Sequence, residues 1–139
     1  MKKILIVEDE KILGEMYKEK FTQAGFEVSL AIEAKEGIEL VEKEKPDLIL
    51  LDILLPRENG IFFLEKLRKI SEIASIPVVA FSNYDDPVTK KQADKLGVKD
   101  YLIKTSYTPS EIVTKIKQLL SEGWKEIYLF ELLKKLSKK

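Results

Sequence analysis

Acidic side chains follow two apolar runs that have the composition of buried strands. The run at 48–51 (LILL) ends in Asp52, and the run at 4–7 (ILIV) ends in Glu8 and Asp9. Continuous apolar runs of this length suit central parallel strands that are covered on both faces. Open α/β sheets place their ligand sites at the carboxyl ends of such strands. The two runs therefore predict a site where carboxylates converge.

Two other polar groups follow later strand-like runs. Ser82 comes after the run at 77–81, and Lys104 comes after the run at 100–103. Clustered carboxylates repel one another unless a positive charge lies among them. Mg²⁺ suits such a cluster, because it takes one or two carboxylates and leaves a position for a phosphoryl oxygen. A carboxylate nucleophile, a divalent ion, a lysine and a hydroxyl are the groups that phosphoryl transfer requires.

Strand-like and helix-like segments alternate along the chain. The predicted strands are 3–7, 27–31, 48–51, 77–81 and 100–103, and the predicted helices are about 10–24, 34–43, 62–70, 87–97 and 109–121. Thr108, Pro109 and Glu111 have the pattern of a helix cap, a first-turn proline and a capping box. Alternation of this kind predicts a flavodoxin-like, doubly wound α/β fold with a five-stranded parallel sheet of order 2-1-3-4-5. In that order the acids at 8, 9 and 52 end neighbouring strands.

Composition narrows the class of protein. The chain has 139 residues, the size of one domain, with equal numbers of acidic and basic residues. It has no cysteine and no histidine, which excludes thiolate chemistry and leaves oxygen ligands for any bound metal. No apolar run approaches the ~20 residues of a membrane span, and the N-terminus lacks a signal-peptide layout. We therefore expect a cytoplasmic protein without membrane contact.

Each candidate residue also has an ordinary structural interpretation. Glu8 and Asp9 could cap the following helix, and Ser82 could cap a turn. Lys104 is one of many lysines, and Tyr101 on an edge strand is more often a packing residue. The site hypothesis depends on these polar groups occurring together at the carboxyl ends of the predicted strands.

Several motifs together resemble the response-regulator receiver domain of two-component signalling. They are ILIVEDE, LILLDILLP followed by NG, VVAFS and DYLIK, all at the spacing of that family. The likeness runs from Lys2 to about Glu122, and in extent the chain is similar to the single-domain chemotaxis response regulator.

The resemblance implies a role for each acidic residue. Asp52 would accept phosphate from a phosphohistidine on a sensor histidine kinase or phosphotransfer protein. Asp9 and Asp52 would bind Mg²⁺, with Mn²⁺ as a second option, together with the backbone carbonyl of Leu54. Glu8 would act on the metal largely through water.

The resemblance also implies the switch. Lys104 would pair with the phosphoryl group, Ser82 would donate its hydroxyl to it, and Tyr101 would turn inward when Ser82 moves. One new charge would thereby change a protein-binding surface. Such a domain catalyses only its own phosphorylation and dephosphorylation and is not an enzyme acting on an outside substrate.

Three positions depart from the family pattern. Asn83 stands where Ala or Gly is usual, and we expect it to crowd the route to Asp52. Thr105 stands where proline usually follows the lysine, often through a cis bond. A cis bond before a non-proline residue costs ~3 kcal/mol, so we predict that the Lys104–Thr105 bond is trans. Leu55 replaces a common methionine, which is a mild change.

Three functions remain to be compared. A stand-alone response regulator is favoured, acting on a downstream effector protein, because no DNA-binding module follows and the chain has only two arginines. A pseudo-receiver would keep the fold as a constitutive protein-interaction scaffold. The third function is a true enzyme, either a nucleotide-binding dehydrogenase or a carboxylate-based phosphatase. Against the dehydrogenase, the first turn lacks a glycine-rich phosphate cradle, and against the phosphatase, Leu54 stands where an acid is needed as proton donor.

The tail adds a helix to the receiver plan. Residues 1–122 are predicted to form the receiver domain and residues 123–139 an amphipathic helix. Tyr128 and the leucines at 129, 132, 133 and 136 fall in one stripe at 100° per residue. Such a stripe has two explanations: the helix packs back on its own domain, or it forms an interface, such as a homodimer or the docking site of a partner helix.

Overall fold

Five short apolar segments form one parallel sheet. The computed structural model describes residues 1–54, 59–83, 85–121 and 124–137. The strands are β1 (Lys3–Val7), β2 (Glu27–Ala31), β3 (Leu48–Asp52), β4 (Val78–Ser82) and β5 (Asp100–Ile103). Their order is β2-β1-β3-β4-β5, and every neighbouring pair is parallel, which confirms the predicted α/β topology.

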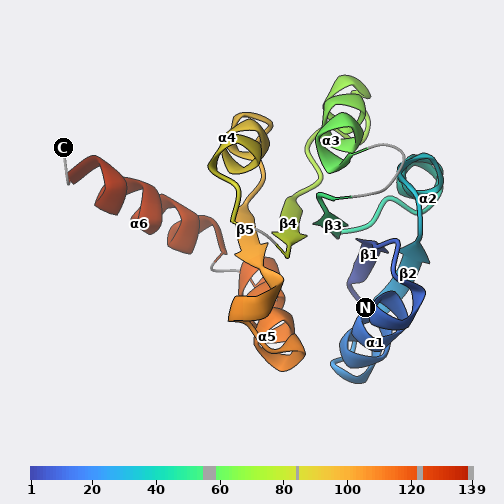
Figure 1. The fold of residues 1–139 in the computed structure, drawn as a ribbon. Coiled ribbons are helices and arrows are strands. Elements are labelled where there is room, and N and C mark those ends of the chain that lie inside the picture. The colour runs from blue at the N-terminus through green and yellow to red at the C-terminus, as the bar shows by residue number, and fades with distance from the viewer. Residues whose placement is uncertain (55–58, 84, 122–123, 138–139) are drawn as a thin grey trace.

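Helices cover both faces of this sheet. The helices that do so are α1 (Lys11–Gln23), α2 (Ala34–Glu44), α3 (Gly60–Lys69), α4 (Pro87–Lys95) and α5 (Pro109–Leu120), and α6 (Trp124–Ser137) follows α5. Figure 1 shows α1 and α5 on one face and α2, α3 and α4 on the other. Within the described residues, none of these helices combines the length and the apolar character that a membrane span needs.

Side chains alternate along each strand, so successive residues of a strand pack on opposite faces of the sheet. Ile4, Ile6, Leu48 and Leu50 pack under α1 and α5. Their neighbours, such as Leu5 and Ile49, pack under α2 and α3. Since successive side chains of a strand point to opposite faces, Asp52 falls on the α1/α5 side and Ser82 on the other side. Asp52 and Ser82, two residues of the candidate site, therefore lie on opposite faces of the sheet.

The element ends differ from the predicted ones by a residue or two, for reasons of strand pairing and capping. β3 and β4 each extend through their polar residue, because Asp52 pairs with Phe81 and Ser82 pairs with Ile103 in the ladder. α3 begins earlier than its apolar spacing predicts, because the Asn59 side chain accepts a hydrogen bond from the backbone N–H of Ile61 at 2.7 Å.

The predicted capping box of α5 is present. The Thr108 hydroxyl accepts from the backbone N–H of Glu111 at 3.2 Å, and the Glu111 carboxylate accepts from the backbone N–H of Thr108 at 2.9 Å. These two hydrogen bonds fix the start of the helix that follows Lys104.

Arg68 joins two connections that lie far apart in the sequence. Its guanidinium donates to the carbonyls of Ala74 and Ile76, at 2.8 and 3.0 Å, in the segment between α3 and β4. It also donates to the carbonyls of Leu96 and Gly97, at 2.8 and 3.4 Å, between α4 and β5. Burial lowers the pKa of Arg68. One side chain thus ties the end of α4 to α3.

Replacing Arg68 with Met should lower the free energy of unfolding by about 3 kcal/mol, because hydrogen bonds from a charged group are worth roughly 1.5–3 kcal/mol each and are not additive. Met keeps the aliphatic stem and removes every donor. Urea unfolding followed by circular dichroism measures the loss. Lys69→Met, an exposed position in the same helix, is the control and should change stability by less than about 0.5 kcal/mol.

α6 projects from the body of the protein. Figure 1 shows it leading away from the end of α5, and described residues of these two helices are in contact. Its four leucines, at 129, 132, 133 and 136, are 41% to 56% exposed. The structure therefore does not show these leucines packed on their own domain. The predicted domain boundary at 122–123 lies outside the described residues.

Candidate functional site

Three carboxylates meet at the carboxyl ends of β1 and β3. Oxygen atoms of Glu8, Asp9 and Asp52 all lie within 4.8 Å of one another. Glu8 and Asp52 are buried, with 0% and 4% of their surfaces exposed, while Asp9 is half-buried. The structure thus brings together the three acids that the sequence placed at neighbouring strand ends.

Lys104 provides a positive charge in this cluster. Its Nζ lies 2.7 Å from Glu8 Oε1 and 3.3 Å from Asp52 Oδ2, and its side chain is 7% exposed. Burial by itself lowers the pKa of Lys104, but the hydrogen bond to Glu8 and the charge of Asp52 outweigh burial and leave this pKa raised. The ammonium therefore stays charged between two carboxylates.

The pKa of Glu8 is strongly raised. Burial and a hydrogen bond with Asp52 raise the pKa of Glu8 to about 8, against the opposing influence of Lys104. The raised pKa reflects the crowding of three carboxyl groups around a single lysine, which a bound cation would relieve. The donors are all carboxylate oxygens, the ligands preferred by Mg²⁺ and Mn²⁺, so the residues present fit such an ion.

The chain after Asp52 is held close to the site. The backbone N–H of Leu54 donates to Asp52 Oδ1 at 3.0 Å. Gly60 approaches so closely that an added Cβ would lie 2.7 Å from Ile53 Cα and 3.0 Å from the Asp52 carbonyl oxygen. Glycine is therefore required where α3 begins beside the site. Leu55, one of the departures from the family pattern, lies outside the described residues.

Ser82 and Tyr101 form a second pair, on neighbouring strands. Ser82 is buried, and Tyr101 is half-buried against the core under α2, α3 and α4. Burial raises the pKa of Tyr101, while a hydrogen bond with Ser82 lowers it. The side chain of Asn83 is exposed, and its predicted crowding of Asp52 stays a prediction.

The bond after Lys104 is trans, as predicted. No peptide bond among the described residues is cis. The segment Lys104–Ser106 forms a 3-10 turn that leads into the Thr108 cap. A short helical turn thus stands where the family usually has a proline.

Phe81 is a neighbour of the site that sequence reasoning did not identify. Its ring centroid lies 4.6 Å from Lys104 Nζ. The signal that could have found it is register, because Phe81 pairs with Asp52 and must face the same side of the sheet.

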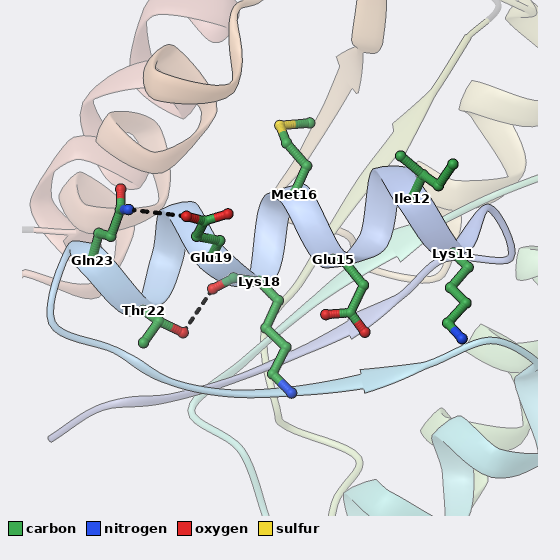
Figure 2. Close-up of a pocket in the computed structure, with 8 residues that line it drawn as sticks. All are labelled: Lys11, Ile12, Glu15, Met16, Lys18, Glu19, Thr22 and Gln23. Carbon is green, nitrogen blue, oxygen red and sulfur yellow. Dashed lines mark hydrogen bonds between the residues drawn. The ribbon is translucent and has the colours of Figure 1, made fainter.

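A surface depression lies beside the site without containing it. It runs along the outer face of α1 and is lined there by Ile12, Glu15, Met16 and Glu19, among others (Figure 2). Ile12 is 89% exposed, although α1 begins only two residues after Asp9. The start of α1 therefore presents an exposed apolar side chain close to the acidic cluster.

Solved structures of other proteins are similar to this chain in fold, and some of them also in sequence. A receiver domain from Methanospirillum hungatei JF-1, described as CheY-like, is 31% identical with a TM-score of 0.81, and the match covers 91% of this chain and 98% of that one. The Mn²⁺-bound form of the response regulator Rcp1 is 24% identical with a TM-score of 0.75, covering 88% and 96% of the two chains, which shows a shared fold.

Curated relatives include longer regulators. The alkaline phosphatase synthesis transcriptional regulatory protein PhoP of Bacillus subtilis (strain 168) is 32% identical over 86% of this chain, which spans 48% of that protein. The "Probable transcriptional regulator ycf29" of Porphyra purpurea is 34% identical, over 94% of this chain and 67% of that protein. The chain thus spans about half the length of PhoP.

The family model described as response regulator receiver domain matches residues 4–117. That range contains the acidic cluster, Lys104 and the Ser82–Tyr101 pair. The chain therefore belongs to the response regulator receiver domain family.

Proposed function

We propose that Asp52 accepts a phosphoryl group from a phosphohistidine on a sensor histidine kinase or phosphotransfer protein, and that the domain then switches its protein-binding surface. The observation that carries this proposal is the convergence of Glu8, Asp9 and Asp52 on Lys104 at one sheet edge. Three buried or half-buried acids around one lysine are costly for stability alone, and are suited to holding a cation and a phosphoryl group.

In the proposed reaction, an Asp52 carboxylate oxygen attacks phosphorus, the bond between phosphorus and the donor imidazole breaks, and its electron pair stays on the imidazole nitrogen. Asp9, Asp52 and the backbone carbonyl of Leu54 would hold Mg²⁺, and Glu8 would contact it through water. When bound, the ion neutralises charge that develops on the phosphoryl oxygens. Lys104 then moves its hydrogen bond from Asp52 to a phosphoryl oxygen.

The switch would use the second pair. The Ser82 hydroxyl would donate to another phosphoryl oxygen, and this would weaken its hydrogen bond with Tyr101. Tyr101 would then turn further into the core under α4, next to the surface that α4 and β5 present. The domain catalyses only its own phosphorylation and dephosphorylation.

The proposed partners are proteins. The phosphodonor would rest on α1, where Ile12 is exposed next to the reactive edge (Figure 2). A downstream effector would bind the surface that phosphorylation changes. A second copy of the chain would associate through the exposed leucines of α6. The scarcity of arginine, with two in the chain, favours protein partners over direct contact with DNA bases.

Incubation with acetyl phosphate and Mg²⁺ tests the proposal, with the aspartyl phosphate detected by intact mass. We expect one phosphoryl group on the wild type and none on Asp52→Asn. Asp94→Asn, at an exposed position of α4, is the matched control and should react like the wild type. A folded wild type that takes up no phosphate would support the pseudo-receiver interpretation, in which the fold is a constitutive scaffold.

A further inference from the structure

An aromatic ring lies beneath the lysine of the site. The Lys104 ammonium is 4.6 Å from the centroid of the Phe81 ring, and the Phe81 side chain is fully buried. Phe81 pairs with Asp52 in the β3–β4 ladder, so the carboxylate and the ring emerge side by side on the α1/α5 face. Lys104 thus contacts three groups at once: two carboxylates and one ring.

A second ring fixes the first. Tyr17 of α1 is 3% exposed, and its ring packs against Phe81 with a centroid distance of 5.5 Å and an interplanar angle of 85°. Edge-to-face geometry of this kind is the preferred arrangement of two aromatic rings. The charges of Lys104 and Glu8 both act on Tyr17, which places this side chain near the same cluster. Tyr17, Phe81 and Lys104 therefore form a continuous series of contacts from α1 to the residue that follows β5.

A lysine ammonium is harder to hold in one position than an arginine guanidinium, so a ring beneath Lys104 has a larger effect on where its charge lies. The lysine ammonium is a point charge on a flexible stem of four carbons, and its donors rotate freely. In the proposed reaction this ammonium must leave Asp52 and reach a phosphoryl oxygen, so its hydrogen bond to Asp52 cannot hold it in place throughout. A ring face attracts the cation without prescribing which acceptor it binds, and the attraction is stronger at a desolvated position such as this one.

We propose that Phe81 is a positioning residue for Lys104 and that Tyr17 acts through Phe81 by fixing its ring. The proposal rests on the function proposed for Asp52. An aliphatic residue at 81 would fill the same core but would offer no ring face, so Lys104 would spend more time in positions from which it cannot reach the phosphoryl group.

Four variants test this proposal in the full chain with acetyl phosphate and Mg²⁺. Phe81→Leu should lower the rate constant of phosphorylation by roughly fivefold to thirtyfold, the rate equivalent of losing a cation–π contact at a desolvated position, and Tyr17→Leu should lower it in the same direction. Tyr17→Phe keeps the ring and should restore the wild-type rate. Phe26→Leu breaks another edge-to-face pair in the same core, with Phe21 at 5.8 Å, and should leave the rate unchanged.

A spectroscopic measurement separates position from reaction. The Lys104 side-chain protons should show upfield ring-current shifts by NMR in the wild type, in Tyr17→Phe and in Phe26→Leu. These shifts should be lost in Phe81→Leu and reduced in Tyr17→Leu. If Phe81→Leu does not fold, Tyr17→Leu provides the test in its place.

The outcomes are distinct. A wild type that is never phosphorylated contradicts the function proposed for Asp52, whatever the shifts are. A wild type that is phosphorylated, with Phe81→Leu or Tyr17→Leu reacting at the same rate, overturns the positioning role alone. Slowing in Phe26→Leu equal to that in Phe81→Leu would also overturn it, because core packing would then be the cause.

Discussion

Replacing Asp9 with Asn should abolish Mg²⁺-dependent phosphorylation of Asp52 while the domain keeps its fold. Asp9 is one of three carboxylates within 4.8 Å of one another, and it is the half-buried member of the cluster. An amide at this position removes a negative charge and an anionic ligand, which Mg²⁺ uses in preference to a neutral amide. The core does not depend on this side chain, so we expect little change in unfolding.

The measurement is a Mg²⁺ titration by NMR together with phosphorylation by acetyl phosphate. Glu10→Gln removes the same charge one residue further on, at an exposed position, and should bind Mg²⁺ like the wild type. Because the pKa of Glu8 is raised to about 8, binding of the ion should displace its proton, and affinity should increase as the pH rises toward 8. Unchanged Mg²⁺ binding in Asp9→Asn would show that the metal site has been assigned incorrectly.

The strands and the acidic residues that follow them could be predicted because local signals carry them, whereas the order of the sheet is inferred from the alternation of strands and helices along the whole chain. Continuous apolar runs mark the central strands, and the acids follow those runs directly, so a parallel sheet brings Glu8 and Asp52 to one edge. The capping box at Thr108 is likewise predicted by a motif of four consecutive residues. In each case the information needed lies within a few residues of the feature that it predicts.

The contacts of long side chains could not be predicted in the same way. Arg68 reaches carbonyls of two connections, and which carbonyls lie within reach depends on how those connections fold. The contact between Lys104 and Phe81 requires the register of two strands and the path of the turn after β5. Sequence spacing predicts the face of a strand on which a residue lies, but not the direction that a flexible side chain takes from it.

The stripe on α6 shows the same limit at the level of a whole helix. Its periodicity predicts an amphipathic helix, and α6 is present at Trp124–Ser137. Periodicity does not indicate what covers the apolar face. The structure decides part of the question, since the leucines at 129, 132, 133 and 136 are 41% to 56% exposed within their own chain.

Removing residues 123–139 should therefore convert a self-associating protein into a monomer with little loss of stability. Four leucines that are about half exposed contribute little to the domain's own core, and an apolar stripe of this size is costly to leave in water. Two copies of α6, each 14 residues and so about 21 Å long, bury less surface than a standard stable interface. We therefore expect an association that depends on protein concentration and is not permanent.

Light scattering after size-exclusion chromatography, over a series of concentrations, measures the mass, and urea unfolding measures the stability. Leu132→Glu should weaken association in the full chain as truncation does, because it places a charge in the stripe. Lys134→Gln, on the opposite side of the helix, should leave association unchanged. A full chain that is monomeric at every concentration, and that loses several kcal/mol on truncation, would mean that α6 packs against its own domain instead.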